Sequence, residues 1–403
     1  MERTVKNNVS WVGKVDWELR SFHGFELSTF RGTTYNSYLI REGKNVLVDT
    51  VWNPYAKEFI DNLKKSIDLN KIDYIVANHG ETDHSGSLAA LIKRIPGVPV
   101  FCTENALDSL KGQFHKNWNF HPVKTGDRLP VGNGKELVFL EMTMLHWPDS
   151  MASYLTGDNI LFSNDAFGQH LASIELWADL ADQCALYEEA IKYYANILQP
   201  YNAIMQNKLK EIAAMGLPME MIAPSHGLIW RTDPMQIVNL YAAWAEAYRE
   251  NQVTLIYDTM WKGTQALAHA ISQGVKAADP SVRVLVCNAG NTDKNDIITE
   301  VFRSKAVAVG SPTVNNGILS TMAAILTLIE EMKFKGKKAA VFGCYGWSGE
   351  SPRILHQWMK KAGFDVMDEG IRYKWHPDDA GLTAAFEYGR KFAGFAGQTN
   401  AVR

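Results

Sequence analysis

Hydrophobic and polar positions follow different patterns in the two halves of this 403-residue chain. Up to about residue 250, short β-branched runs are separated by polar turns, which is typical of strands in a mixed structure. This pattern predicts a layered α/β sandwich with polar groups along one edge of its sheets. The expected strands are residues 36–39, 45–49, 71–77, 136–141 and 160–163, and the expected helices are residues 88–93, 188–196 and 235–249.

The second half has a more regular pattern, in which short apolar runs alternate with stretches of helical periodicity. Strict alternation of strand and helix predicts a doubly wound, parallel sheet of five strands. We therefore expect two domains, residues 1–250 and residues 251–403, divided near residues 250–252. The expected strands are residues 253–257, 282–287, 306–310, 338–343 and 364–367, and the expected helices are residues 265–273, 295–303, 319–332 and 354–361.

Composition narrows the function classes without identifying one. Apolar residues make up 46% and charged residues 21% of the chain, which is ordinary for a globular protein. A net charge of −3 gives no reason to expect nucleic acid or an anionic membrane as a partner. Residues 1–13 lack the pattern of a signal peptide, and apolar stretches such as residues 322–329 are too short to span a bilayer. We therefore expect a cytoplasmic protein that binds neither membranes nor nucleic acid.

The cysteines give a second constraint on function. Cys102, Cys184, Cys287 and Cys344 are spread singly along the chain, and no Cys-x-x-Cys pair occurs. The expected state of each is a reduced thiol, and no rubredoxin-type or iron–sulfur centre is expected in this sequence. If the protein performs redox chemistry, its electrons are expected from a separate partner.

One polar segment concentrates potential metal ligands. His79, Glu81, Asp83 and His84 lie within six positions, directly after the apolar run at residues 71–77. Carboxylates packed so closely repel each other unless a cation offsets their charge. The segment therefore predicts a metal site, and the carboxylate at position 81, in place of a further histidine, favours iron over zinc.

Three later segments each place a candidate ligand directly after an apolar run: His146, Asp165 and His226. A single histidine at a strand end is more often a packing or hydrogen-bonding residue, but three such positions after the first segment indicate one metal centre. Carboxylate oxygens and imidazole nitrogens without a thiolate suit iron, although zinc remains open. His84 is either a direct ligand or a residue that hydrogen-bonds to a metal-bound water. His23 and Tyr194 could supply protons to the centre or steer a bound gas molecule, but an ordinary structural role is the favoured interpretation for both.

Three polar, glycine-containing loops follow the first, third and fourth expected strands of the second half. In a doubly wound sheet, ligands bind at such strand ends. Backbone N–H groups and the hydroxyls of Thr259 and Thr264 at a helix N-terminus would bind a phosphate monoester. A Gly-x-Gly-x-x-Gly fingerprint is absent, so tight NAD binding is not expected. The loop residues are Thr259, Met260, Trp261, Lys262, Gly263 and Thr264; Ser311, Pro312, Thr313, Asn315, Asn316 and Gly317; and Tyr345, Gly346, Trp347, Ser348 and Gly349.

In this order, His-x-Glu-x-Asp-His followed by His, Asp and His resembles the metallo-β-lactamase-like domain of the flavodiiron proteins (A-type flavoproteins). Hydrolases of that fold usually carry His-x-His-x-Asp-His and hold zinc. The resemblance covers essentially the whole chain, because these proteins continue into a flavodoxin-like domain. It implies an αββα sandwich followed by a flavodoxin-like sheet that binds FMN. It also implies two iron ions, one held by His79, Glu81 and His146 and the other by Asp83, His84 and His226, with Asp165 bridging both.

The resemblance further implies a reaction and an assembly. We expect reduction of nitric oxide to nitrous oxide, of dioxygen to water, or of both, with FMN relaying electrons from rubredoxin or a similar donor. The chain is most similar to the subgroup that reduces nitric oxide. A head-to-tail homodimer, or a dimer of such dimers, is expected to bring one subunit's flavin beside the other's irons. The alternatives are a zinc hydrolase fused to a flavodoxin, a deazaflavin-dependent oxidase of the same family and a plain electron carrier.

Overall fold

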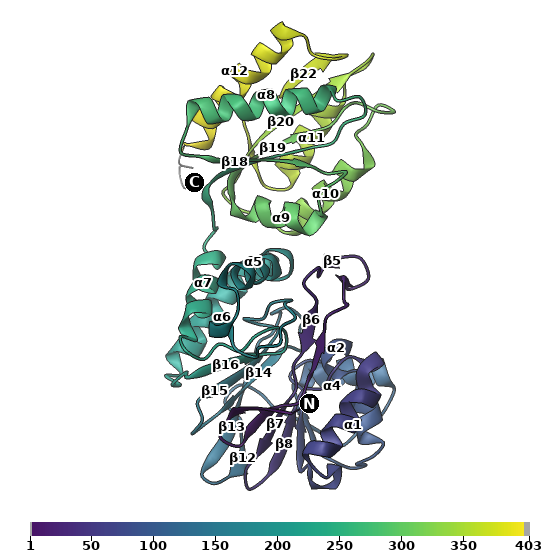
Figure 1. The fold of residues 1–403 in the computed structure, drawn as a ribbon, viewed down its shortest axis with the longest axis vertical. Coiled ribbons are helices and arrows are strands. Elements are labelled where there is room, and N and C mark those ends of the chain that lie inside the picture. Colours follow the sequence, from purple (N-terminus) through teal and green to yellow (C-terminus); the bar gives the residue numbers. More distant parts are fainter. Residues whose placement is uncertain (1, 399–403) are drawn as a thin grey trace. The chain divides into compact units, whose positions relative to one another are not determined.

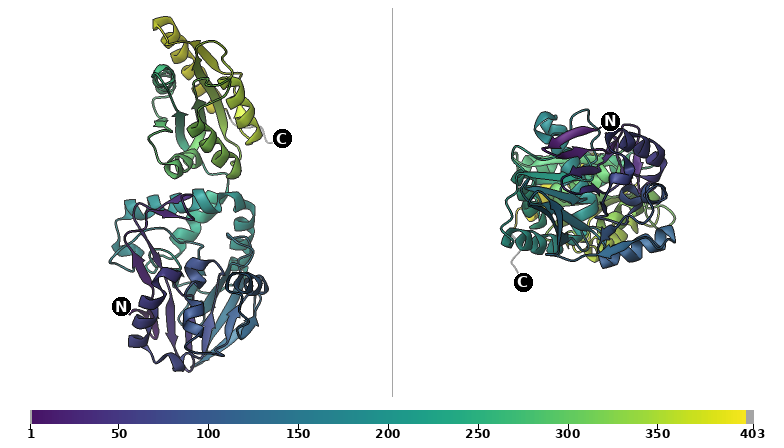
Figure 2. Two further views of the ribbon diagram at one scale, coloured as in Figure 1. Left: turned by 90° about the vertical axis from the view of Figure 1, so that its right-hand side faces the viewer. Right: turned by 90° about the horizontal axis from the view of Figure 1, so that it is seen from below.

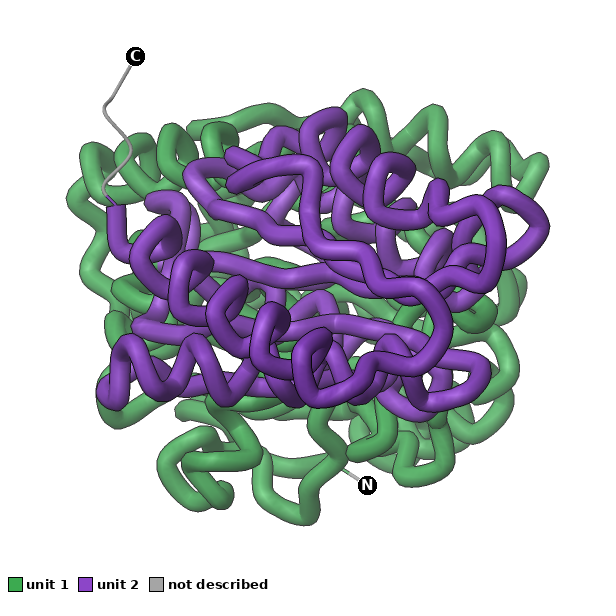
Figure 3. The backbone as a smooth tube through the Cα atoms, turned by 90° about the horizontal axis from the view of Figure 1, so that it is seen from above, with its two compact units in different colours: residues 1–194, 201–243 green, residues 195–200, 244–403 purple. Residues whose placement is uncertain are grey.

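The computed structural model of the protein describes residues 2–398, and these residues form two compact units (Figure 3). Unit 1 comprises the chain up to Tyr194 together with Tyr201–Ala243. Unit 2 comprises Ala195–Pro200 and the described chain from Trp244 onward. The sequence-based domain ranges, residues 1–250 and 251–403, stay a prediction.

Unit 1 contains two large sheets that share one hydrophobic core, with helices on their outer faces (Figure 1). Rings from the two sheets meet in this core, where the centroids of Tyr38 and Phe162 lie 5.0 Å apart. The first sheet has the order β1 (Arg3–Lys6), β2 (Val9–Trp11), β7 (Tyr38–Arg41), β8 (Asn45–Val48), β9 (Tyr74–Val76), β10 (Val100–Cys102) and β11 (Phe120–Pro122). The second has the order β12 (Arg128–Gly132), β13 (Lys135–Glu141), β14 (Met151–Leu155), β15 (Ile160–Asn164) and β16 (Met221–Pro224).

The smaller elements of unit 1 complete the sandwich. Helix α1 shows why these segments are helical, because its buried residues Ala56, Phe59, Ile60 and Leu63 form one apolar stripe. The helices are α1 (Ala56–Ser66), α2 (Thr82–Ser85), α3 (Leu88–Ile92), α4 (Glu104–Phe114), α5 (Gln183–Tyr193), α6 (Asn202–Ala214) and α7 (Met235–Ala245). Two short antiparallel pairs join β3 (Lys14–Asp16) to β6 (Thr33–Tyr35) and β4 (Ser21–Phe22) to β5 (Leu27–Ser28).

Most predicted elements of unit 1 are present, with shifted ends. The expected pair at residues 36–39 and 45–49 is the antiparallel pair β7 and β8, which confirms that prediction. The helix expected at residues 188–196 starts earlier, because the Asp182 carboxylate caps α5 by accepting hydrogen bonds from the backbone N–H groups of Cys184 and Ala185. Helix α7 ends at Ala245, before the predicted end at residue 249.

Unit 2 is a parallel sheet with helices on both faces (Figures 1 and 2). Its main strand order is β18-β17-β19-β20-β21, the doubly wound order in which ligands bind at the carboxyl ends. The strands are β17 (Glu250–Tyr257), β18 (Arg283–Asn288), β19 (Ser304–Gly310), β20 (Lys338–Tyr345), β21 (Asp365–Val366) and β22 (Ile371–Lys374). The helices are α8 (Gly263–Ala278), α9 (Lys294–Arg303), α10 (Ser320–Glu331), α11 (Ser351–Lys361) and α12 (Asp379–Ala396).

The sheet of unit 2 has six strands, where the sequence predicted five. The fifth position is shared by two short strands, since β21 pairs with the start of β20 and β22 pairs with its end. Gly370, with φ of +85°, lies directly before β22 and divides the edge into these two segments. The parallel, doubly wound architecture itself is confirmed. Among residues 2–398, no helix combines the length and the apolar character needed to cross a membrane.

Candidate metal centre and flavin pocket

The candidate ligands of unit 1 come together from the ends of separate elements. His79 lies in the connection after β9, whereas Asp83 and His84 lie on the short helix α2. Asp165 follows β15 directly, and His226 lies two residues after β16. Because β15 and β16 are parallel neighbours, their carboxyl ends deliver these last two side chains to the same edge.

The candidate side chains form two groups, and within each group all the ligand atoms lie within 4.8 Å of one another. The structure thus assembles all seven candidates from four distant segments, in the same two sets that the resemblance implied. The assignment of each side chain as a ligand remains a proposal. The first group is His79, Glu81, His146 and Asp165, and the second is Asp83, His84 and His226.

Asp165 faces both groups with different oxygens. Its Oδ2 lies 3.6 Å from His79 Nε2 and 3.5 Å from His146 Nε2. Its Oδ1 lies 3.1 Å from His84 Nε2 and 3.6 Å from His226 Nε2. A carboxylate with one oxygen toward each group has the arrangement required of a bridge between two metal ions.

The histidines are oriented by partners behind them. His226 Nδ1 donates a hydrogen bond to the carbonyl oxygen of Thr34 at 2.6 Å, which leaves Nε2 directed at the centre. His79 Nδ1 lies 2.9 Å from Asp149 Oδ1, and Asp149 Oδ2 accepts a hydrogen bond from the backbone N–H of Gly80. Such outer partners fix the ring orientation of metal-ligating histidines and raise their basicity. Asp149 was not predicted, because nothing in the local sequence distinguishes it from a surface aspartate.

The electrostatics of the centre favour positive charge. Burial alone would lower the pKa of His79, but the hydrogen bonds to Asp149 and Glu81 raise it to about 10. Burial also opposes the charged form of His146, while Asp165 and Glu81 raise its pKa to about 9. Although burial would raise it, the neighbouring imidazoles hold the pKa of Asp165 well below its ordinary value. The buried carboxylates therefore attract cations, whether these are protons on the imidazoles or metal ions.

Hydrogen bonding within the described chain does not satisfy these buried atoms. Both carboxylate oxygens of Asp83, Nε2 of His84 and Oδ2 of Asp165 are buried, and several of them form ion-pair contacts, for example 3.0 Å between His84 Nε2 and Asp83 Oδ2, but none of them makes a contact of hydrogen-bond geometry among residues 2–398. Leaving such charged atoms unpaired is costly, and coordination of a metal removes that cost. His84 Nε2 belongs to the same compact group of ligand atoms as Asp83 and His226, which is the position expected of a direct ligand. The donor set of oxygens and nitrogens without sulfur therefore fits two iron ions.

A cavity of about 390 Å³ opens onto the centre. Its lining includes Glu81 and Asp83 together with Phe22, His23 and Trp52. His23 Nε2 lies 2.8 Å from Glu81 Oε1, so this side chain reaches the centre, where the sequence favoured an ordinary structural role. Small molecules therefore have a path to the two ligand groups.

Two further residues near the centre, besides Asp149, escaped prediction. His170 is buried, its ring centroid lies 4.9 Å from that of His226, and its Nδ1 lies 2.8 Å from Thr33 Oγ1. Burial and the charge of His226 keep the pKa of His170 well below its ordinary value. Tyr193 packs against His170 at 5.1 Å, whereas the predicted Tyr194 donates its hydroxyl to Asn202 instead. Neither His170 nor Tyr193 ends an apolar run, so the sequence offered no signal for them.

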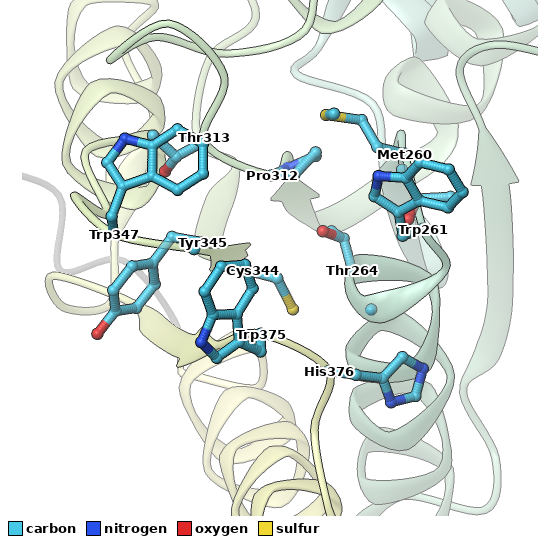
Figure 4. A pocket seen from close by; sticks show the side chains of 13 residues that line it. Met260, Trp261, Thr264, Pro312, Thr313, Cys344, Tyr345, Trp347, Trp375 and His376 are labelled. Carbon is cyan, nitrogen blue, oxygen red and sulfur yellow. The ribbon is translucent and has the colours of Figure 1, made fainter.

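Unit 2 contains a second cavity, of about 490 Å³, at the carboxyl ends of its strands (Figure 4). All three predicted loops contribute to it. Three lining residues were outside the predicted set: Cys344, Trp375 and His376. The predicted residues that line it are Thr259, Met260, Trp261, Gly263, Thr264, Pro312, Thr313, Tyr345, Gly346 and Trp347.

The other predicted loop residues do not line this cavity. Several of them hold the loops in shape, as when Asn316 Nδ2 donates to Glu350 Oε1 and Ser311 Oγ accepts from the backbone N–H of Leu319. Sequence patterns identified the loops but not which side chains face the ligand. The residues outside the lining are Lys262, Ser311, Asn315, Asn316, Gly317, Ser348 and Gly349.

The cavity of unit 2 fits a flavin mononucleotide. The hydroxyl oxygens of Thr259 and Thr264 are buried at the N-terminus of α8 without a hydrogen-bond partner in the described chain. A helix N-terminus with free donors binds phosphate. Around the opening, the side chains of Trp261, Trp347 and Trp375 are exposed by 85%, 84% and 63%, which offers aromatic surface for a planar ring.

These features define a class of protein: a β-lactamase-like metal-binding domain followed by a flavodoxin-like domain. Residues 33–227 match the family described as ODP family beta lactamase, and residues 255–389 match the flavodoxin family. The chain is 50% identical, over 96% of its length and 79% of the relative's, to an anaerobic nitric oxide reductase flavorubredoxin from Aeromonas hydrophila. A flavorubredoxin of the same name from Escherichia coli is also 50% identical, over 98% of this chain and 82% of that protein.

Solved structures agree with this class. Rubredoxin oxygen:oxidoreductase from Desulfovibrio gigas matches with a TM-score of 0.95 and 34% identity, over 98% of each chain. The flavodiiron protein from Giardia intestinalis matches with a TM-score of 0.93 and 32% identity, over 98% of this chain and 97% of that one. The chain belongs to the flavodiiron protein family.

Proposed function

We propose that the protein is an oxidoreductase that reduces nitric oxide to nitrous oxide and dioxygen to water at a non-haem diiron centre. FMN, held by the residues that line the cavity of unit 2, would supply an electron relay to this centre from rubredoxin or a similar carrier. The observation that carries the proposal is Asp165, which presents one oxygen to each of two ligand groups in a chain that also holds a flavin pocket. A zinc hydrolase would have no use for that pocket.

The residues of this chain have separate tasks in that reaction. When bound, two iron ions and FMN supply up to four electrons, enough for dioxygen, whereas joining two nitric oxide molecules needs two. Phe22 and Trp52 line the approach to the centre, and His23 is placed to hold or pass a proton beside Glu81. Asp149 keeps the ring of His79 in position. The relatives named as nitric oxide reductases support nitric oxide as the first substrate.

The distribution of the two sites over separate units supports a proposed assembly. The ligand groups lie in unit 1 and the flavin pocket in unit 2, and domains of this size are tens of ångströms across. We propose a head-to-tail homodimer, or a dimer of such dimers, in which one subunit's flavin serves the other's centre. Sedimentation that found an active, stable monomer would contradict this assembly. Separately, the proposed location of the protein is the cytoplasm.

Anaerobic stopped-flow spectroscopy tests the reaction. The reduced protein is mixed with nitric oxide or with dioxygen, and reoxidation of the flavin is followed by its absorbance. Rapid reoxidation by at least one gas is the expected result, together with two irons and one FMN per chain in the purified protein. Zinc in place of iron, with no reoxidation by either gas, would overturn the proposed function and favour the hydrolase alternative.

A further inference from the structure

The flavin pocket has a wall that none of its three loops supplies. Strand β22 pairs with the end of β20, matching Cys344 with Tyr373 and Tyr345 with Lys374. The backbone N–H of Trp375 then donates to the carbonyl oxygen of Tyr345 at 2.7 Å, which extends the ladder by one residue. The edge strand therefore delivers Trp375 and His376 to the cavity, and both line it.

The backbone of Trp375 adopts a conformation that bulky residues rarely tolerate. Its φ is +60°, in the left-handed region, and strained residues of this kind cluster at functional sites. Packing of the side chain into the core does not explain this conformation, because Trp375 is 63% exposed. An exposed indole held in a strained position indicates a ligand contact better than a packing role.

Neighbouring glycines make room for this residue. A Cβ atom at Gly346 would lie 2.8 and 2.9 Å from Cζ3 and Cη2 of the Trp375 indole. A Cβ atom at Gly263, on the phosphate side, would lie 3.4 Å from the Trp375 carbonyl oxygen. Trp375 thus has its backbone near the phosphate loop and its ring against the third loop. The ring centroid also lies 6.5 Å from that of Trp347 (Figure 4).

We propose that Trp375 is a positioning residue for the flavin, whose indole contacts the bound isoalloxazine while Thr259 and Thr264 hold the phosphate. The proposal rests on the function proposed above. It adds the edge strand β22 as a fourth contributor to the pocket. Gly346 supports the contact by leaving space for the indole, so the two residues act as a pair.

Titration of deflavinated full-length protein with FMN, followed by flavin fluorescence, tests the proposal. Trp375→Ala is expected to weaken FMN binding about tenfold, the loss typical of one aromatic contact. Trp375→Phe is expected to restore most of the affinity. The reduction potential and the visible circular dichroism of bound FMN are also expected to change in Trp375→Ala, because the indole contacts the isoalloxazine. A residue with a purely structural role would leave both properties unchanged. Trp17→Ala, an exposed tryptophan of unit 1, is the matched control and is expected to bind FMN normally.

A double-mutant cycle separates a direct contact from a general loss of stability. Gly346→Ala is expected to weaken FMN binding in the wild-type background but to have little further effect in Trp375→Ala, because the displaced indole is then absent. Trp375→Gly, which suits the positive φ, is the variant to use if Trp375→Ala folds poorly. Unchanged affinity, potential and dichroism in Trp375→Ala would overturn this proposal alone. Failure of the unsubstituted protein to bind FMN would overturn the proposed function itself.

Discussion

The two sites of the molecule are built on opposite principles. The centre in unit 1 gathers charged side chains that are mostly buried, and several of its oxygen and nitrogen atoms lie close together without forming hydrogen bonds. The pocket in unit 2 gathers exposed aromatic rings around two unpartnered hydroxyls at a helix N-terminus. The first site is therefore specified by charge and the second by shape and surface. Changes that abolish one are expected to spare the other.

The largest expected effect concerns the residue that joins both ligand groups. Asp165→Ala removes the carboxylate that faces four imidazoles, so both metal sites are expected to lose their ions or to bind them incompletely. The rate of gas reduction is expected to fall by more than about 100-fold, because substitution of a residue that only supports a ligand already lowers activity by up to about 100-fold. Iron analysis and stopped-flow reoxidation measure the two effects. The flavin content is expected to remain at one per chain.

A matched control distinguishes this effect from a general loss of charge. Asp108 is an exposed aspartate on α4, and Asp108→Ala is expected to retain both irons and full activity. If Asp165→Ala also retained two irons and normal turnover, the bridging role would be wrong. If it lost FMN as well, the independence of the two sites would be wrong.

A smaller effect is expected one step away from the ligands. Asp149→Asn keeps the shape of the side chain that contacts His79 Nδ1 and the Gly80 N–H but removes its charge. Metal affinity is expected to fall about 10- to 100-fold, because the imidazole loses the partner that orients it and raises its basicity. Competition with a chelator, followed by iron analysis, measures the change. An affinity equal to that of the unsubstituted protein would show that Asp149 is dispensable.

The two sites also differed in how far the sequence predicted them. All seven metal candidates could be selected from the sequence, because each lies at or near the end of an apolar run and the structure brings these ends together in two groups. The residues behind them, Asp149 and His170, were not, because their roles depend on which distant segments fold against them. In unit 2 the loops were predictable from their position after strands. Trp375 was not, because it follows β22, a short strand without a distinct apolar pattern.

The next prediction tests the unpartnered hydroxyls of the flavin pocket. Thr264→Val preserves the shape of a buried side chain but removes the hydroxyl that is proposed to donate to the phosphate. FMN affinity is expected to fall roughly tenfold, since a hydrogen bond to a charged group contributes about 1.5 kcal/mol or more. Riboflavin, which lacks the phosphate, is expected to bind the variant and the unsubstituted protein equally. Thr327→Val, on the exposed face of α10, is the control, and equal losses for both ligands would contradict a phosphate contact.

The smallest expected effect comes from a charge that unit 2 buries without a metal. Lys337 is buried, and its Nζ donates to the carbonyl oxygens of Tyr248, Phe302 and Ser304 at 2.9, 2.7 and 2.7 Å. Burial lowers its pKa from 10.5 to about 7. Unit 1 balances its buried imidazoles with carboxylates, whereas this ammonium is held mainly by backbone carbonyls. Its protonation is therefore expected to work against folding.

The sign of the resulting pH dependence follows from proton binding. Between pH 7 and the ordinary lysine pKa, the unfolded chain keeps a proton that the folded chain releases, so the free energy of unfolding rises with pH. The contribution of Lys337 is expected to approach about 1.4 kcal/mol per pH unit at most. The window is pH 7 to 8, because above it the thiols of Cys102, Cys287 and Cys344, whose pKa burial raises, begin to act in the opposite direction.

Denaturant unfolding at several pH values tests this in the intact protein. Lys337→Met is expected to abolish the rise between pH 7 and 8, while Lys360→Met, at an exposed position on α11, is expected to keep it. The difference between the slopes is the quantity to measure, because it cancels every group that titrates alike in both proteins. Loss of the three hydrogen bonds lowers the stability of Lys337→Met without depending on pH. Equal slopes in Lys337→Met and the unsubstituted protein would mean that the three carbonyls keep Lys337 charged throughout. Unit 2 would then tolerate a buried cation through backbone dipoles alone, and the contrast with unit 1 would be sharper.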